Sequence, residues 1–155
     1  LDIVCLMPTN VYGDNDNFNK VNGHVIPAVI SKIEEAKKSN KKKVQLLGTG
    51  KPLREFIHVE DLAEGHVAAL KYAKNNIGFL SINLGTGIGN SVKDLIVKFE
   101  SISKKKINYI VGKRREGDAP ELYGDSTLAT KLLLWTPKYK IDDMIKHTWN
   151  WKTKS

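Results

Sequence analysis

Two adjacent arginines, Arg114 and Arg115, begin the segment whose residue types point most directly to ligand chemistry. Paired guanidinium groups in a loop can bind phosphate oxygens in a bidentate manner. Asp118 follows three residues later, and its carboxylate could accept hydrogen bonds from ribose hydroxyls. A solvated charged loop is the alternative, and residues 114–120 by themselves leave both interpretations open.

Arg54 adds weight to anion binding, because it lies beside apolar residues at the start of a predicted strand. A half-buried arginine requires an anionic partner. Within the chain that partner would be Glu55 or Asp61, and in a functional interpretation it would be a diphosphate.

Among the four histidines, His24 is the candidate for acid chemistry. It follows a long polar loop and stands at the mouth of a predicted helix, where an imidazole could act as an acid near neutral pH. His58 lies in a predicted strand and is interpreted as structural, whereas His66 and His147 are interpreted as helix-face residues. No spacing of cysteine and histidine suggests a metal site, and no Ser/His/Asp order indicates a nucleophilic triad.

Three glycines, Gly85, Gly87 and Gly89, form a turn between a predicted strand and a predicted helix, where a dinucleotide fingerprint would lie. That fingerprint is Gly-x-Gly-x-x-Gly, so its third glycine would fall at position 90, and position 90 is Asn. We therefore interpret the segment as a tight turn. The pair Tyr109 and Lys113 has the spacing of a catalytic Tyr/Lys pair, but it falls on a predicted strand, where the two side chains cannot meet as they would on a helix.

The composition excludes several classes of protein. The chain has 155 residues, 41% hydrophobic and 27% charged, as in globular proteins that bury a core, which excludes intrinsic disorder. No apolar run approaches the ~20 residues of a membrane span. The apolar start lacks the basic lead-in and cleavage site of a signal peptide. Cys5 is the only cysteine, which excludes a disulfide scaffold and favours the cytoplasm.

The net charge of +8 favours anionic partners, either nucleic acid or phosphorylated small molecules. Most of the excess is lysine in short solvated runs at residues 37–38, 41–43 and 104–106. We therefore expect no nucleic-acid partner. A nucleic-acid binder would instead show strongly salt-dependent binding to any duplex.

Hydrophobic periodicity and turn residues divide the chain into alternating strands and helices. Strands are predicted at residues 1–6, 44–47, 53–59, 79–84 and 107–111, and a loop at residues 10–23. Helices are predicted from Pro27, from an N-cap at Asp61, from a capping box of Ser91 with Asp94, over residues 126–134 and over residues 141–151. This order predicts an α/β chain with at least part of its sheet parallel, folded as one unit over residues 1–155.

The sequence resembles the nucleotide-sugar epimerases of the extended short-chain dehydrogenase/reductase family over nearly its whole length. The resemblance to the GDP-L-fucose synthase group is carried by MPTNVYG (residues 7–13), DNF (16–18), HVIPA (24–28) and GTGKPLREF (48–56). From residue 57 onward it resembles the UDP-glucose 4-epimerase group, in IHVEDLAEGHV (57–67), NLGTGIGNSV (83–92), RREGD (114–118) and residues 143–151.

The resemblance implies a role for particular residues. His24 matches the acid for epimerisation in the fucose-synthase group, which there partners a cysteine upstream of this chain, so Cys5 does not fill that role. The implied contacts to the nucleotide sugar are Asn10 in the sugar pocket, Lys32 at a phosphate or the base, Leu46 and Leu47 beside the base, Arg54 and Arg115 on the diphosphate, Asp118 on the ribose, and Leu122 at the residue that borders the sugar.

The resemblance also implies that the chain is a C-terminal half: the substrate-binding domain with the last strands and helices of the Rossmann domain. NAD or NADP would then be bound mainly by an N-terminal half, and the chain alone would be inactive. The expected partner is a GDP- or UDP-hexose, with a homodimer possible. The expected reaction is epimerisation with C4 reduction. The alternatives are a UDP-glucose 4-epimerase and a non-catalytic nucleotide-sugar-binding module.

Overall fold

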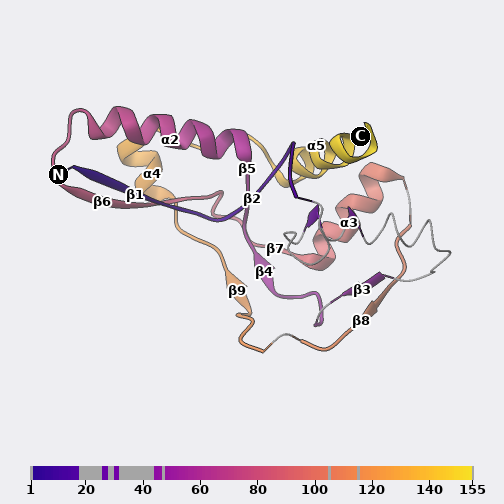
Figure 1. Ribbon diagram of the computed structural model, residues 1–155. Coiled ribbons are helices and arrows are strands. Elements are labelled where there is room, and N and C mark those ends of the chain that lie inside the picture. The colour runs from indigo at the N-terminus through magenta and orange to yellow at the C-terminus, as the bar shows by residue number, and fades with distance from the viewer. Residues whose placement is uncertain are drawn as a thin grey trace.

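The computed structural model describes residues 2–17, 26–27, 30–31, 44–46, 48–104, 106–114 and 116–154 (Figure 1). Its helices are α2 (Val59–Ala73), α3 (Val92–Ser103), α4 (Thr127–Leu133) and α5 (Ile141–Lys154). Its strands are β1 (Ile3–Pro8), β2 (Asn10–Tyr12), β3 (Val44–Leu46), β4 (Leu53–Arg54), β5 (Phe56–His58), β6 (Phe79–Leu84), β7 (Asn90–Ser91), β8 (Tyr109–Val111) and β9 (Glu121–Leu122). Within these residues, every helix is too short or too polar to cross a membrane.

Most strand pairs in the described part of the chain are parallel, as the alternation of strands and helices predicted. β1 pairs with β6, β2 with β5, and β3 with β8, each in parallel. β4 is the middle strand of a three-stranded sheet, parallel to β9 and antiparallel to β7. Helix α2 runs along the β1–β6 pair with α4 beside it, and α3 packs against α5 at the other end of the molecule (Figure 1). The α/β prediction is confirmed.

Two predictions about the strands need correction. The segment predicted as a loop from residue 10 opens with β2, which forms because Asn10 and Tyr12 pair with Phe56 and His58 across the chain. The single strand predicted at residues 53–59 is two strands, β4 and β5, which belong to different sheets and are separated by Glu55. Both differences arise from pairing between distant segments, which local periodicity does not record.

The helix starts follow one prediction and correct another. The Ser91–Asp94 capping box is present at α3, with each backbone N–H donating to the other residue's side chain at 3.1 Å. Helix α2 begins at Val59, and its N-cap is His58, whose Nδ1 accepts from the N–H of Glu60 at 3.3 Å. Asp61 does not cap α2, because its buried carboxylate accepts instead from the N–H groups of Lys138 and Tyr139, both at 3.0 Å.

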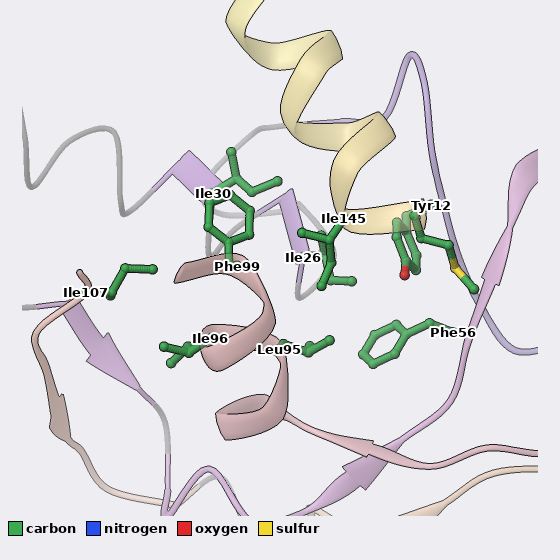
Figure 2. Close-up of a cluster of buried hydrophobic side chains, with 10 residues drawn as sticks. Tyr12, Ile26, Ile30, Phe56, Leu95, Ile96, Phe99, Ile107 and Ile145 are labelled. Atoms are coloured by element: carbon green, nitrogen blue, oxygen red, sulfur yellow. The ribbon is translucent and has the colours of Figure 1, made fainter. Parts of the chain in front are cut away.

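Strand β5 separates two hydrophobic clusters, because successive side chains of a strand point to opposite faces. Phe56 belongs to a cluster with side chains of α3 and α5, in which its ring meets that of Tyr12 edge-on at 5.6 Å (Figure 2). Ile57 belongs to a second cluster with Ile82, Leu84 and side chains of α2 and α4. The short strand β5 therefore contributes side chains to both clusters.

His58, at the end of β5, packs within a small aromatic cluster. It is 2% exposed, and its ring stacks on Tyr139 with centroids 4.1 Å apart. Its Nε2 lies 3.2 Å from Nδ1 of His147 on α5. Burial, and next the neighbouring His147, lower the pKa of His58 below its ordinary value of 6.5. The carboxylates of Asp14, Glu60 and Asp61 act in the opposite direction on this pKa. The buried position agrees with the structural role predicted for His58.

The lowered pKa of His58 predicts a loss of stability on acidification. The unfolded chain binds a proton at His58 more readily than the folded chain, so the free energy of unfolding should fall as the pH drops below 6.5. Urea unfolding at about pH 7.5 and about pH 5.5 measures this difference. His147→Gln should make the difference smaller, because the second imidazole no longer lowers the pKa of His58. The control His66→Gln alters an exposed histidine of α2 and should behave as wild type. Equal pH dependence in all three proteins would contradict the assignment.

Candidate active site

A buried carboxylate, that of Glu55, organises the region that contains two of the predicted site residues, Asn10 and Leu122. Glu55 is 1% exposed, although it lies between two short strands and carries a side chain that is ordinarily ionised. Its Oε1 accepts from the N–H of Gly87 and from the Oγ1 of Thr86, the latter at 3.3 Å. Its Oε2 accepts from the N–H of Gly124 at 2.8 Å. Such charge-assisted bonds compensate for the cost of removing a carboxylate from water.

The backbone of Glu55 holds a third segment in place. Its carbonyl oxygen accepts from the Oγ1 of Thr9 at 3.1 Å and from the side-chain amide of Asn10 at 2.7 Å. Its N–H donates to the carbonyl of Leu122 at 3.2 Å. The chain after β1, the turn after β6 and the chain after β9 are therefore all bonded to one residue.

These three segments surround a cavity of about 480 Å³. Its lining comes from residues 7–11, from Glu55, from residues 83–85 and from residues 122–124 with Ser126. Two further bonds tie the walls together: the Asn83 side chain donates to the carbonyl of Asp125 at 3.2 Å, and the Ser126 hydroxyl donates to the carbonyl of Gly85 at 2.9 Å. The cavity is partly polar and large enough for a monosaccharide-sized group.

The glycine turn after β6 is packed against the Glu55 carboxylate and bonded to it. A Cβ added to Gly85 would lie 2.3 Å from Oε1 of Glu55, so no other residue fits there without a shift. The N–H of Gly87, which adopts φ +70, already donates to the same oxygen. The turn therefore brings its backbone N–H to an internal carboxylate and does not fit the pyrophosphate of a dinucleotide. This agrees with the interpretation of the segment as a tight turn.

Arg54 and Asp118, predicted as separate ligand contacts, form an ion pair with each other. The Arg54 Nη2 also donates to the carbonyl of Ala119 at 2.8 Å, and its Nη1 donates to the carbonyl of Leu53 at 2.6 Å. The intrachain partners expected for Arg54, Glu55 and Asp61, are instead engaged with backbone N–H groups. Asp118 takes their place because β4 lies parallel to β9 and brings residues 118–122 alongside.

Other predicted residues divide between the cavity and the part of the chain that is not described. Asn10 and Leu122 both line the cavity, and Leu122 lies opposite Arg54 in the β4–β9 register. His24, Lys32, Leu47 and Arg115 lie outside the described residues, as does the side chain of Leu46, whose backbone forms the end of β3. Tyr109 lies on β8 and Lys113 beyond its end, so this pair is not on a helix.

Sequence reasoning missed Glu55 and the segment from Tyr123 to Ser126 as parts of the cavity. The sequence did show an acidic residue, Glu55, beside the apolar run of Phe56 and Ile57. That pattern is equally consistent with an ion-pair partner for Arg54 and with a buried carboxylate. No signal marked the lining residues Tyr123, Gly124 and Ser126, because their segment is brought to the cavity by hydrogen bonds to residues distant in sequence.

Comparison with known proteins identifies relatives of both groups that the sequence resembles. The family described as "NAD dependent epimerase/dehydratase family" matches residues 1–85. The "Putative GDP-L-fucose synthase 2" of Arabidopsis thaliana is 39% identical over 152 residues, which cover 97% of this chain and 44% of that protein. The UDP-glucose 4-epimerase of Drosophila melanogaster is 47% identical over 110 residues, which cover 70% of this chain and 31% of that protein.

A solved structure with the same fold is the UDP-glucose-4-epimerase from Stenotrophomonas maltophila with bound NAD and formylated UDP-arabinopyranose. The TM-score is 0.84 at 28% identity, covering 99% of this chain and 48% of that one. The resemblance and the fold class are both confirmed. The chain spans less than half the length of each of these relatives.

The contact between Gly85 and Glu55 predicts a position-specific cost of adding a methyl group. Gly85→Ala should lower the free energy of unfolding by about 1–3 kcal/mol, because the new Cβ overlaps a buried carboxylate held by backbone donors. The control is Gly124→Ala, where an added Cβ makes ordinary contacts with Asn83 at 3.6 Å and keeps the N–H that Glu55 accepts. Chemical denaturation of the two variants measures the difference, and equal stabilities would contradict this account of the turn.

Proposed function

The chain belongs to the NAD dependent epimerase/dehydratase family, and we propose that it carries the nucleotide-sugar site of an epimerase. The observation that carries the proposal is the cavity lined by Glu55, Asn10 and Leu122, together with the Arg54–Asp118 ion pair on the neighbouring strand β4. Leu122 lines the cavity and pairs with Arg54 in the β4–β9 register, and a partly polar cavity with a guanidinium on the neighbouring strand fits a hexose attached to a diphosphate.

The proposed contacts follow the order of groups in a nucleotide sugar. The hexose lies against Asn10 and Leu122, and Arg54 with Arg115 holds the diphosphate. Asp118 accepts from the ribose, with Lys32, Leu46 and Leu47 toward the base. Arg54 is half-buried and already oriented by bonds to Asp118 and two backbone carbonyls, so little side-chain entropy remains to be lost when phosphate binds.

His24 is proposed as the acid that protonates one face of the sugar during epimerisation at C3 and C5. NAD or NADP would supply hydride chemistry at C4. The N–H of Gly87 in the glycine turn is already used by Glu55, so we propose that the cofactor is bound mainly by a part of the protein other than this turn. The proposed contribution of the substrate-contacting residues of this chain is to hold the substrate in one orientation.

A UDP-hexose 4-epimerase is the second candidate function. It is favoured by the higher identity, 47%, to the Drosophila melanogaster UDP-glucose 4-epimerase. Such an enzyme removes and returns a hydride at C4 and needs no separate acid at position 24. The two candidates therefore differ in the preferred base, guanine or uracil, and in whether His24 takes part.

Calorimetric titration with GDP and with UDP tests the site and separates the two candidates. Tighter binding of GDP supports the fucose-synthase type, and tighter binding of UDP supports the 4-epimerase type. Arg54→Gln should weaken binding of the preferred diphosphate by about tenfold or more, since charge-assisted hydrogen bonds are lost. Lys98→Gln removes the same charge from a residue that pairs with Asp142 and does not line the cavity, and it serves as the control. An equal loss in both variants would indicate general attraction of anions by a basic chain.

His24→Asn tests the acid in a longer polypeptide that includes the cofactor-binding part. The substitution should remove epimerisation at C3 and C5, measured by exchange of the sugar protons with deuterated solvent, while the affinity for the nucleoside diphosphate stays as in wild type. Unchanged exchange in the variant would refute this role for His24, and absence of exchange in the wild-type protein would favour the 4-epimerase.

A further inference from the structure

The Glu55 side chain touches two of the cavity walls at once. One carboxylate oxygen binds the turn after β6 through Gly87, and the other binds the chain after β9 through Gly124. Gly124 lies in the cavity lining, and Gly87 follows the lining residue Gly85 by two positions. Since each oxygen accepts a hydrogen bond from a different wall, the size of one carboxylate sets the distance between the two walls.

We infer that Glu55 is a positioning residue, whose buried carboxylate fixes the separation of the two walls of the sugar cavity and so its fit to the hexose. The inference rests on the function proposed above. Glu55 lines the cavity, but both of its carboxylate oxygens are engaged by backbone N–H groups, so its role is assigned to the turn at Gly85 and the segment that begins at Leu122, which it holds in place. The third wall, at Asn10, is held by the backbone carbonyl of Glu55, so it does not depend on the Glu55 side chain.

Asp61 offers a matched comparison within the same chain. It is also 1% exposed, and its two carboxylate oxygens also accept from two backbone N–H groups, those of Lys138 and Tyr139. It differs from Glu55 in its place, because neither Asp61 nor its two partners line the cavity. A purely structural effect of losing a buried carboxylate should therefore be common to both positions, and an effect on the cavity should be confined to Glu55.

The substitutions Glu55→Gln and Asp61→Asn keep the size of each side chain and replace one acceptor oxygen by an amide donor. In either variant, one of the two backbone N–H groups then faces an N–H₂ group and loses its acceptor. The denaturant midpoints of both variants should fall by similar amounts. The denaturant midpoint thus measures the loss of stability that the two variants share. The binding results for each variant are then compared with that loss.

The binding measurement isolates the sugar. The probes are UDP against UDP-glucose and GDP against GDP-fucose, titrated into the 155-residue chain and both variants. In wild type and in Asp61→Asn, the sugar-bearing nucleotide should bind more tightly than the diphosphate by the same ratio. In Glu55→Gln that ratio should fall by about tenfold, equivalent to about 1.4 kcal/mol, with the affinity for the diphosphate alone much less affected. An unchanged ratio in Glu55→Gln, or an equal fall in both variants, would overturn the inference.

Hydrogen–deuterium exchange separates this inference from the proposed function. In Glu55→Gln, the amides of residues 85–88 and 122–125 should exchange faster than in wild type. In Asp61→Asn, the faster exchange should be confined to residues 135–139. If the wild-type chain binds neither nucleotide pair, the proposed function fails for this chain, and exchange alone then tests whether Glu55 holds the two walls. Unaltered exchange at residues 85–88 and 122–125 in Glu55→Gln would show that it does not.

Discussion

The burial of the Glu55 carboxylate is the constraint on which the rest of this structure depends. A carboxylate that is 1% exposed is tolerated only when donors replace the water it has lost. Here the donors are backbone N–H groups of Gly87 and Gly124 and the hydroxyl of Thr86, all from segments remote in sequence. Each of those segments must therefore approach one point. The glycine at position 85, the break between β4 and β5, and the cavity are consequences of that approach.

The stretch from Glu55 to Asp61 works as the central connection of the described fold. Phe56 and Ile57 enter different hydrophobic clusters, so a strand of three residues joins both cores. His58 caps α2 and meets α5, and Asp61 holds the backbone of residues 138–139. Buried polar groups at both ends of the stretch select one arrangement of the surrounding segments, which apolar packing alone specifies less strictly.

The same geometry connects the fold with the proposed chemistry. The glycine turn lies where a dinucleotide-binding turn would lie in sequence, yet its backbone donor is used by Glu55. The anion-binding group proposed for this region is instead Arg54, one residue before Glu55, held by Asp118 and backbone carbonyls. The Arg54 guanidinium thus belongs to the residue next to a single buried acid, Glu55, whose side chain lines the cavity. This arrangement suits a ligand with a charged diphosphate and an uncharged sugar.

Local sequence patterns were sufficient to predict the α/β order of elements, the capping box at Ser91, the strand β6 and the membership of a family, because these depend on neighbouring residues and on short motifs. The folded structure was needed to show that Arg54 pairs with Asp118, that β2 and β9 are strands, that His58 caps α2, and that Glu55 lines a cavity. The decisive contacts join residues far apart, 64 positions for Arg54 with Asp118 and 69 for Glu55 with Gly124. The sequence shows which donors and acceptors each residue carries. Which partner each of them bonds to is fixed only when the chain folds and water is excluded.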